Sequence, residues 1–162
     1  MNRAVRLRPA VAADAAQLSE IALAAKHALG YSAELIEAWR PELLIDARTV
    51  LGQPTWIALC EGVAAGFFSL NIDRRKARLK HLWVSPDRQR RGIGGVLLLL
   101  RALQLAVEAG ADTFEADAEP SAEGFYLRHG LSRVGEIAAP ISGNARRVRP
   151  QMRCVLAAVV RD

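Results

Sequence analysis

Glycine and arginine residues are concentrated between positions 88 and 95, where an apolar stretch ends and a leucine-rich stretch begins. The first backbone N–H groups of a helix lack partners within the helix and lie at the positive end of its dipole. Glycine has no Cβ and adopts positive φ readily, so several N–H groups can converge on one anion. Arg88, Arg90 and Arg91 add positive charge. We therefore predict that this segment binds a pyrophosphate.

Two well-known phosphate-binding loops do not fit this segment. A Walker loop ends in Gly-Lys-Ser/Thr, whereas Gly94 is followed by Gly95 and Val96. The dinucleotide fingerprint needs a third glycine three residues after the second, and Leu97 stands there. That fingerprint also places its glycines directly after a strand, whereas residues 85–91 intervene here. The segment needs a different explanation.

An apolar strand and an apolar helix must position this segment. In the strand predicted over residues 77–84, a period of two places Ala77, Leu79, His81 and Trp83 on one face. His81 could be a hydrogen-bonded core residue or a residue that relays a proton, and the pattern leaves both open. The helix predicted over residues 95–109 is apolar nearly all round and ends at Gly110.

The rest of the chain is predicted as short alternating elements. Strands are expected over residues 4–8, 55–60, 63–72, 113–118, 131–137 and 151–160, helices over residues 14–29, 32–43 and 120–129, and a loop over residues 138–150. The first helix should bury an apolar stripe at helical spacing, Leu18, Ile21, Ala22, Ala25 and Leu29. Ser32 is the candidate N-cap of the second helix, and Glu61-Gly62 is the expected hairpin turn. Strands and helices alternate around the glycine segment, which favours an α/β fold with a mixed, mostly antiparallel central sheet flanked by helices. A length of 162 residues fits one domain, residues 1–162.

Composition narrows the class of protein. The net charge of +5 could indicate a nucleic-acid-binding protein, but the arginines are spread along the chain and are not interleaved with aromatic residues. The N-terminus has no apolar core of a signal peptide, so we expect a cytoplasmic protein. Cys60 and Cys154 lie in apolar runs and are expected as buried thiols. Neither the histidines nor the cysteines have metal-site spacing.

Two segments resemble conserved motifs of one enzyme superfamily. The pattern Gln89-x-x-Gly92-x-Gly94, preceded by Leu82-Trp83-Val84-x-Pro86, resembles the acetyl-CoA loop of the GNAT superfamily of N-acetyltransferases. Further on, Ala122-x-x-Phe125-Tyr126-x-x-x-Gly130-Leu131 resembles a second GNAT motif, in which phenylalanine usually stands last. Many relatives carry an asparagine three residues before that alanine, whereas this chain has Glu119. We therefore expect no side-chain amide contact to the pantetheine arm.

The resemblance implies how acetyl-CoA, the acyl donor, would bind. The strands that end at Val84 and Ala118 would splay apart, and the pantetheine arm would pair with the backbone of Leu82, Trp83 and Val84 in that slot. The pyrophosphate would be bound by the loop residues Gln89, Arg90, Arg91, Gly92, Ile93, Gly94 and Gly95. Tyr126 would also contact the donor.

The implied reaction moves an acetyl group from the thioester to a primary amine. Tyr126 is the expected proton donor to the departing thiolate, because a phenol with a reference pKa of about 10 stays protonated at neutral pH. Packing beside Phe125 is the alternative role for this tyrosine. His81 would lie near the thioester, where many relatives carry a glutamate, so the identity of the general base stays open.

The resemblance gives only a general description of the acceptor and of the partners. In the family the helical pair before residue 55 covers the acceptor pocket, which makes Lys26, His27 and Tyr31 candidate substrate residues. Trp39 is a further candidate, or a core residue of the second helix. The acceptor would be a small-molecule amine or a peptide; no nucleic acid or membrane is expected, and a homodimer is possible. The alternative function is a sensor that binds acyl-CoA without transferring the acyl group.

Overall fold

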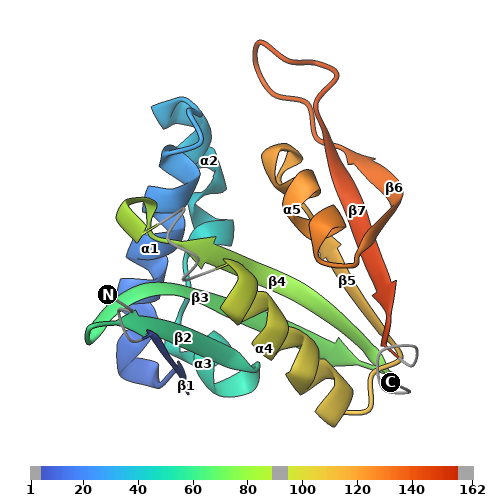
Figure 1. Cartoon of the computed structure of the whole chain (residues 1–162). Helices are drawn as coiled ribbons and strands as arrows, with labels where there is room; N and C mark the ends of the chain where they lie inside the picture. The colour runs from blue at the N-terminus through green and yellow to red at the C-terminus, as the bar shows by residue number, and fades with distance from the viewer. Residues whose placement is uncertain (1–4, 89–94, 157–162) are drawn as a thin grey trace. The chain divides into compact units, whose positions relative to one another are not determined.

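The computed structural model describes residues 5–88 and 95–156 (Figure 1). The strands are β1 Val5–Pro9, β2 Thr55–Cys60, β3 Val63–Asp73, β4 Lys76–Val84, β5 Thr113–Asp117, β6 Ser132–Ala138 and β7 Val148–Val155. The helices are α1 Ala15–His27, α2 Ala33–Leu43, α3 Ala47–Gly52, α4 Gly95–Glu108 and α5 Glu123–Arg128. Short 3₁₀ turns precede three of these elements, η1 Ala12–Asp14, η2 Pro86–Arg88 and η3 Pro120–Ala122.

The strands form one mixed sheet in the order β1-β2-β3-β4-β5-β7-β6. Antiparallel pairs join β1 to β2, β2 to β3, β5 to β7 and β6 to β7, whereas β4 and β5 are parallel. The parallel register runs from Lys76 opposite Thr113 to Leu79 opposite Ala116. The predicted α/β fold with a mixed, mostly antiparallel sheet is confirmed.

Contacts along the chain define two compact units. The first contains Met1–Leu70 and Lys80–Ala102, and the second contains Asn71–Leu79 and Leu103–Asp162. The chain passes between the units within β3, β4 and α4. We describe each unit separately.

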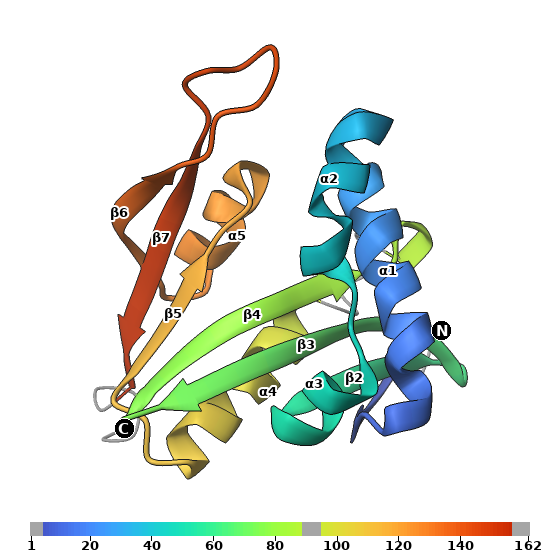
Figure 2. The same ribbon diagram turned by 180° about the vertical axis from the view of Figure 1, so that it is seen from behind.

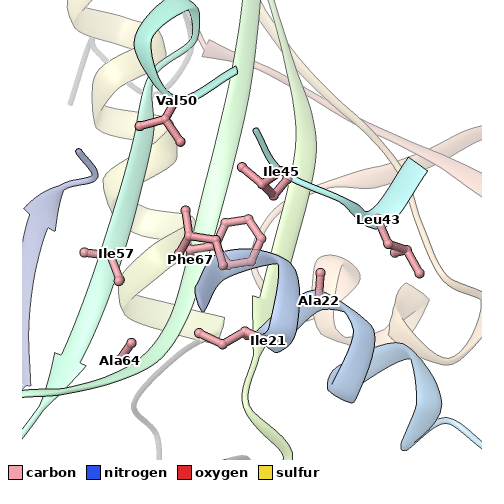
Figure 3. Close-up of a cluster of buried hydrophobic side chains, with 9 residues drawn as sticks. Ile21, Ala22, Leu43, Ile45, Val50, Ile57, Ala64 and Phe67 are labelled. Atoms are coloured by element: carbon pink, nitrogen blue, oxygen red, sulfur yellow. The ribbon is translucent and has the colours of Figure 1, made fainter. Parts of the chain in front are cut away.

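Helix α1 supplies much of the hydrophobic core of the first unit (Figure 3). The predicted apolar stripe is buried at Leu18, Ile21, Ala22 and Ala25. The prediction was wrong at Leu29, which lies beyond the end of α1 and is exposed. Leu18, Ile21 and Ala22 pack with residues of the neighbouring helices and strands and of the α2–α3 connection, namely Leu43, Ile45, Val50, Ile57, Ala64 and Phe67. Figure 2 shows α1 and α3 on the same face of β2 and β3.

Local sequence signals explain two turns of this unit. The hydroxyl oxygen of Ser32 accepts a hydrogen bond from the backbone N–H of Leu35 at 3.2 Å, which caps α2 as predicted. Glu61 and Gly62 both have positive φ, which matches a tight hairpin turn between β2 and β3. Helix α3 was not predicted, although Asp46 caps it by accepting from the N–H of Thr49 at 2.7 Å.

The second unit packs α5 against β6 and β7 (Figure 1). Its buried side chains include Phe114, Met152, Tyr126 and Leu131. Residues 138–150 were predicted as a loop and the last strand over residues 151–160, but β7 begins at Val148. The early start follows from pairing with β6, where Val148 lies opposite Ala138. Residues 157–160 of the predicted strand lie outside the described residues.

Candidate active site

The structure describes the strand before the predicted anion-binding loop and the helix after it. Strand β4 ends at Val84, and the N–H of Ser85 donates to the carbonyl of Ala65 at 2.7 Å. Gly95 is the first residue of α4. The loop residues themselves, Gln89, Arg90, Arg91, Gly92, Ile93 and Gly94, lie outside the described residues. The strand and the helix that should position the loop are therefore in place.

Arg88 precedes this loop and was expected to add positive charge to it. Its Nη1 atom donates to the Sγ atom of Cys60 at 3.6 Å, and its Nε atom lies 3.7 Å from a carboxylate oxygen of Asp87. The side chain is only 18% exposed. The guanidinium of Arg88 is thus bound to β2 and to its own neighbour.

The end of β4 approaches β3 very closely at Gly66. A Cβ atom at this position would lie 2.7 Å from the carbonyl oxygen of Trp83 and 3.3 Å from the Cα atom of Val84. On the same side it would lie 3.2 Å from the side chain of Leu98 in α4. Only glycine fits this position without displacing the backbone of Trp83 and Val84. Sequence reasoning missed Gly66, although an isolated glycine within a strand often marks such an approach.

His81 and Trp83 extend from the same face of β4, as their spacing predicted. The indole N–H of Trp83 donates to Nδ1 of His81 at 3.2 Å, and the ring of Phe67 lies 6.0 Å from the His81 ring. Burial lowers the pKa of His81 to about 4, and the nearby charge of Lys80 acts in the same direction. His81 is therefore neutral at pH 7 and is a weak base.

Lys26 is a buried cation surrounded by three aromatic rings. Its Nζ atom lies 4.3 Å from the ring centroid of Trp39, 5.0 Å from that of Tyr31 and 5.9 Å from that of Trp83. Lys26 is only 8% exposed, and the rings of Tyr31 and Trp39 meet edge to face at 4.9 Å. We call these four residues the Lys26 cluster.

The Lys26 cluster unites part of the predicted acceptor site. Lys26 and Tyr31 were predicted as substrate residues, and the structure brings them together with Trp39 and Trp83. His27, the third candidate, is exposed at the end of α1 and is not one of the four. Trp39 also packs against the core of the first unit, so it serves both the core and the cluster.

Tyr126 is buried in the second unit and lies beside Phe125, as predicted. The two ring centroids are 5.3 Å apart at 68°, and Tyr126 is 6% exposed. Its carbonyl accepts the N–H groups of His129 and Leu131, both at 3.1 Å, which fixes the end of α5. Burial raises the pKa of the Tyr126 hydroxyl to about 12, while the positive charge of Arg149 acts in the opposite direction.

Arg149 is a second residue of this region, and sequence reasoning missed it. Its Nη2 atom donates to the carbonyl of Asp117, the last residue of β5, at 2.7 Å. Its Nε atom is buried and has no hydrogen-bond partner in the part of the chain that the structure describes. A buried donor without a partner is costly, so it is a candidate contact for a bound ligand. No sequence signal separated Arg149 from the other arginines.

Glu119 stands where many GNAT relatives carry an asparagine. Its carboxylate lies 3.5 Å from Nη2 of Arg147, and both side chains are largely buried. Arg147 also donates to the carbonyl of Ala139 at 3.0 Å. Glu119 therefore takes part in an ion pair that connects the end of β5 to the loop before β7.

The described residues show neither a metal-binding cluster nor a membrane-spanning helix. The described residues contain no group of three or more histidine, cysteine, aspartate or glutamate side chains that could hold a metal ion. Over residues 5–88 and 95–156, no helix has both the length and the apolar character of a membrane span. Cys60 is a buried free thiol, and Cys154 is a half-buried one whose pKa is raised by burial.

Comparison with known proteins gives consistent matches. Residues 52–131 match the family model described as an acetyltransferase (GNAT) domain. No curated protein sequence matches the chain. A GCN5-related N-acetyltransferase from Rhodopseudomonas palustris is 28% identical with a TM-score of 0.74, over 93% of this chain and 94% of that one.

Two further solved structures contain a bound coenzyme. The PaiA N-acetyltransferase from Thermoplasma acidophilum, in complex with coenzyme A, is 21% identical with a TM-score of 0.72, over 94% of this chain and 99% of that one. The yncA protein from Salmonella typhimurium, solved with acetyl-CoA, is 23% identical with a TM-score of 0.69, over 94% of each chain. Both share the fold of this chain.

Proposed function

Because the chain belongs to the GNAT superfamily of acetyltransferases, we propose that it transfers an acetyl group from acetyl-CoA to a primary amine. The observation that carries this proposal is the family match over residues 52–131, which includes both the glycine segment and Tyr126. Similar folds bound to coenzyme A and to acetyl-CoA support acetyl-CoA as the donor. The acceptor is a small-molecule amine or the N-terminus of a protein, and residues 1–162 act as one catalytic domain.

Backbone groups of the protein bind acetyl-CoA both at its pantetheine arm and at its pyrophosphate. The pantetheine arm pairs with the backbone of Leu82, Trp83 and Val84 as an added strand would. This assignment is supported by the register, because β4 continues to Val84 whereas its pairs with β5 run only to Leu79. The pyrophosphate binds residues 89–94 and the N-terminus of α4 at Gly95.

Tyr126 stabilises the leaving group. The ammonium form of the acceptor first loses a proton to solvent, and the neutral amine then attacks the thioester carbonyl. The C–S bond of the tetrahedral intermediate breaks, the sulfur leaves as a thiolate, and the nitrogen releases its second proton to water as the amide forms. With a pKa of about 12, the Tyr126 hydroxyl stays protonated beside a thiol of reference pKa about 8.5. It therefore donates a hydrogen bond to the thiolate, and full proton transfer is not required.

Arg149 supports Tyr126 electrostatically. Its charge lowers the pKa of the Tyr126 hydroxyl against the larger effect of burial, which makes the hydroxyl a stronger hydrogen-bond donor. We assign Arg149 as a positioning residue for the leaving-group step.

His81 fits better as a positioning residue than as the general base. A primary ammonium group has a pKa near 10, so transfer of its proton to a histidine of pKa about 4 is unfavourable by about six units. Its Nδ1 atom is also occupied by the indole N–H of Trp83. A water-mediated relay through His81 is the competing proposal, and the pH dependence of turnover separates the two.

The test is the release of free CoA thiol from acetyl-CoA in the presence of amines. We would screen amino acids, polyamines, aminoglycosides and N-terminal peptides, with mass spectrometry of the acetylated product. Thiol release that requires both the amine and Tyr126 supports the proposal. Binding of acetyl-CoA by calorimetry without release for any amine would instead identify an acyl-CoA sensor.

A further inference from the structure

Two arginines of the second unit connect the start of β7 to the end of β5. Arg149, the second residue of β7, donates through Nη2 to the carbonyl of Asp117, the last residue of β5, at 2.7 Å. Arg147 lies immediately before β7, and its Nη2 atom is 3.5 Å from the carboxylate of Glu119, two residues beyond the end of β5. The two contacts therefore join the same two segments of the chain.

The Glu119–Arg147 ion pair is almost entirely removed from solvent. The side chains of Glu119 and Arg147 are 11% and 6% exposed. Arg147 is also held next to the end of β6, because its Nη1 atom donates to the carbonyl of Ala139 at 3.0 Å and its carbonyl accepts from the N–H of Ala139 at 3.0 Å. Loss of one partner of a buried ion pair leaves an uncompensated charge, which is strongly unfavourable. The pair therefore fixes Arg147 between the ends of β5 and β6.

The position of Arg147 determines the position of Arg149, because only Val148 separates them. A displacement of the chain at Arg147 is passed on to Arg149 through the intervening residue. The charge of Arg149 acts on the Tyr126 hydroxyl, where it opposes the rise in pKa that burial causes. An interaction between charges weakens with distance. The effect of Arg149 on Tyr126 therefore depends on a fixed start of β7.

We propose that Glu119 is a positioning residue, which fixes the start of β7 through Arg147 and thereby holds Arg149 where its charge acts on Tyr126. This inference rests on the proposed role of Tyr126 in acetyl transfer. It adds to that role the residues that hold Arg149 in place. Glu119 acts through the ion pair and does not itself contact the reacting atoms.

The first experiment separates positioning from stability. Glu119→Gln leaves the Arg147 charge buried without its partner, so the melting temperature should fall. Turnover should fall about 5- to 20-fold, because Arg149 loses its fixed position. The double variant of Glu119→Gln and Arg147→Met removes both charges, so its melting temperature should return towards that of the wild type while its turnover stays low. Turnover that recovers together with the melting temperature would show a purely structural role and would overturn the inference.

Asp112→Asn is the matched control. It removes the carboxylate of another ion pair of the second unit, in which Nη2 of Arg75 lies 2.9 Å from Oδ1 of Asp112 just before the opposite end of β5. The side chains of that pair are 73% and 50% exposed, so turnover should change less than about twofold. A loss as large as that of Glu119→Gln would mean that any ion pair of this unit has the same effect, and the inference would fail.

A cycle of variants tests whether Glu119 acts through Arg149. In Arg149→Met the guanidinium is absent, so the addition of Glu119→Gln should lower turnover further by less than about twofold. If Glu119→Gln causes its full loss of turnover in this background, Glu119 acts by another route and the inference is overturned.

A titration of Tyr126 requires no turnover and so tests the inference apart from the proposed function. The chain has two tyrosines, so in Tyr31→Phe protein labelled with 3-fluorotyrosine Tyr126 gives the one ¹⁹F resonance. The fluorine lowers the pKa of a phenol, which brings ionisation to a lower pH. The midpoint should rise in Glu119→Gln, in the same direction as in Arg149→Met and by a smaller amount. A direct effect of the lost carboxylate would lower the midpoint, so an unchanged or lowered midpoint contradicts the inference.

Failure of the inference and failure of the proposed function give different results. If the midpoint rises in Glu119→Gln but no amine is acetylated, the proposed function fails and the positioning of Arg149 stands. If amines are acetylated while the midpoint and the turnover of Glu119→Gln match those of the wild type, the inference fails and the function stands. Should Glu119→Gln fail to fold, the double variant with Arg147→Met supplies both measurements.

Discussion

The indole N–H of Trp83 donates a hydrogen bond to Nδ1 of His81 across 3.2 Å. The two residues are two positions apart in β4, so their side chains leave the same face of the strand. Because Nδ1 is the acceptor, the neutral ring carries its proton on Nε2, and a protonated ring would have no acceptor to offer. Protonation of His81 therefore removes the hydrogen bond that orients the Trp83 ring. Because Trp83 is one of the three rings of the Lys26 cluster, the geometry of that cluster depends on neutral His81.

The first prediction concerns stability at low pH. The pKa of His81 is lowered from 6.5 to about 4 in the folded chain, so the unfolded chain binds more protons between these values. The stability that neutral His81 contributes is thus present above pH 6.5 and is lost as the pH falls through 6.5 towards 4. His81→Asn keeps an acceptor oxygen and removes the titration. Between pH 7.5 and 4.5 the free energy of unfolding should fall in both proteins. The fall should be about 2 to 3 kcal/mol smaller in His81→Asn than in the wild type.

Urea unfolding at the two pH values provides the measurement. Exposed carboxylates and the other histidines contribute equally to both proteins, so the difference between the proteins isolates His81. The same pH dependence in both would show that His81 titrates normally in the folded chain.

The second prediction tests the close approach of β3 and β4. Gly66→Ala places a methyl group 2.7 Å from the carbonyl oxygen of Trp83, which backbone movement must relieve. We expect a loss of about 1 to 3 kcal/mol in stability, as for other overpacked sites. Acetyl-CoA should also bind more weakly, because the backbone assigned to the pantetheine arm is displaced. Thermal unfolding and calorimetry measure the two effects.

Gly52→Ala is the matched control for Gly66→Ala. No atom lies within 4 Å of a Cβ built at Gly52, and its φ is not positive. The control should unfold within about 0.5 kcal/mol of the wild type. If both variants behave alike, the contact at Gly66 does not constrain β4.

The third prediction concerns the glycine segment itself. Gly94→Asp would introduce a carboxylate and a side chain where the sequence motif places the pyrophosphate. Losing two charge-assisted hydrogen bonds, each of about 1.5 to 3 kcal/mol, should weaken acetyl-CoA binding by about a hundredfold or more. Calorimetry with an intact circular dichroism spectrum provides the test. Unchanged affinity in a folded variant would remove the loop from the donor site.

Sequence patterns predicted the features that depend on neighbouring residues. The cap at Ser32, the turn at Glu61 and Gly62, and the C-terminal glycine Gly110 follow from local backbone preferences. The buried stripe from Leu18 to Ala25 could also be predicted, because it requires only that apolar residues recur with the helical period of 3.6. The strand before the loop and the helix after it were also predicted from their apolar patterns.

Features that depend on distant residues could not be read from the sequence. The start of β7 at Val148 is set by pairing with Ala138, and the glycine and asparagine between them suggested only a loop. The Lys26 cluster joins residues of α1, of the segment between α1 and α2, of α2 and of β4, and no spacing rule connects Lys26 to Trp83. Arg149 and Tyr126 are distant in the sequence, and only the fold brings the charge of Arg149 near the Tyr126 hydroxyl. Tertiary contacts therefore decided the finer composition of the candidate site.

The fourth prediction concerns the Tyr126 hydroxyl. Tyr126→Phe removes one oxygen and keeps the ring that packs beside Phe125. If the hydroxyl stabilises the thiolate, turnover should fall by about 10² to 10⁴ while acetyl-CoA affinity hardly changes, because the bond forms chiefly in the transition state. Turnover and affinity are measured on one preparation with the best acceptor. Near-normal turnover would restrict Tyr126 to a packing role.

The last prediction tests whether Arg149 acts through Tyr126. Arg149→Met removes the charge that opposes the burial of the Tyr126 hydroxyl, and turnover should fall about 10- to 100-fold. Arg153→Met is the control, because Arg153 lies on the same strand, is 44% exposed and pairs with Glu115 at 3.8 Å. It should alter turnover less than about twofold. In the double variant of Tyr126→Phe and Arg149→Met, the losses should be less than additive, since the second change removes support for a hydroxyl that is already absent. Fully additive losses would mean that Arg149 acts independently of Tyr126, and an unchanged rate in Arg149→Met would exclude it from the leaving-group step.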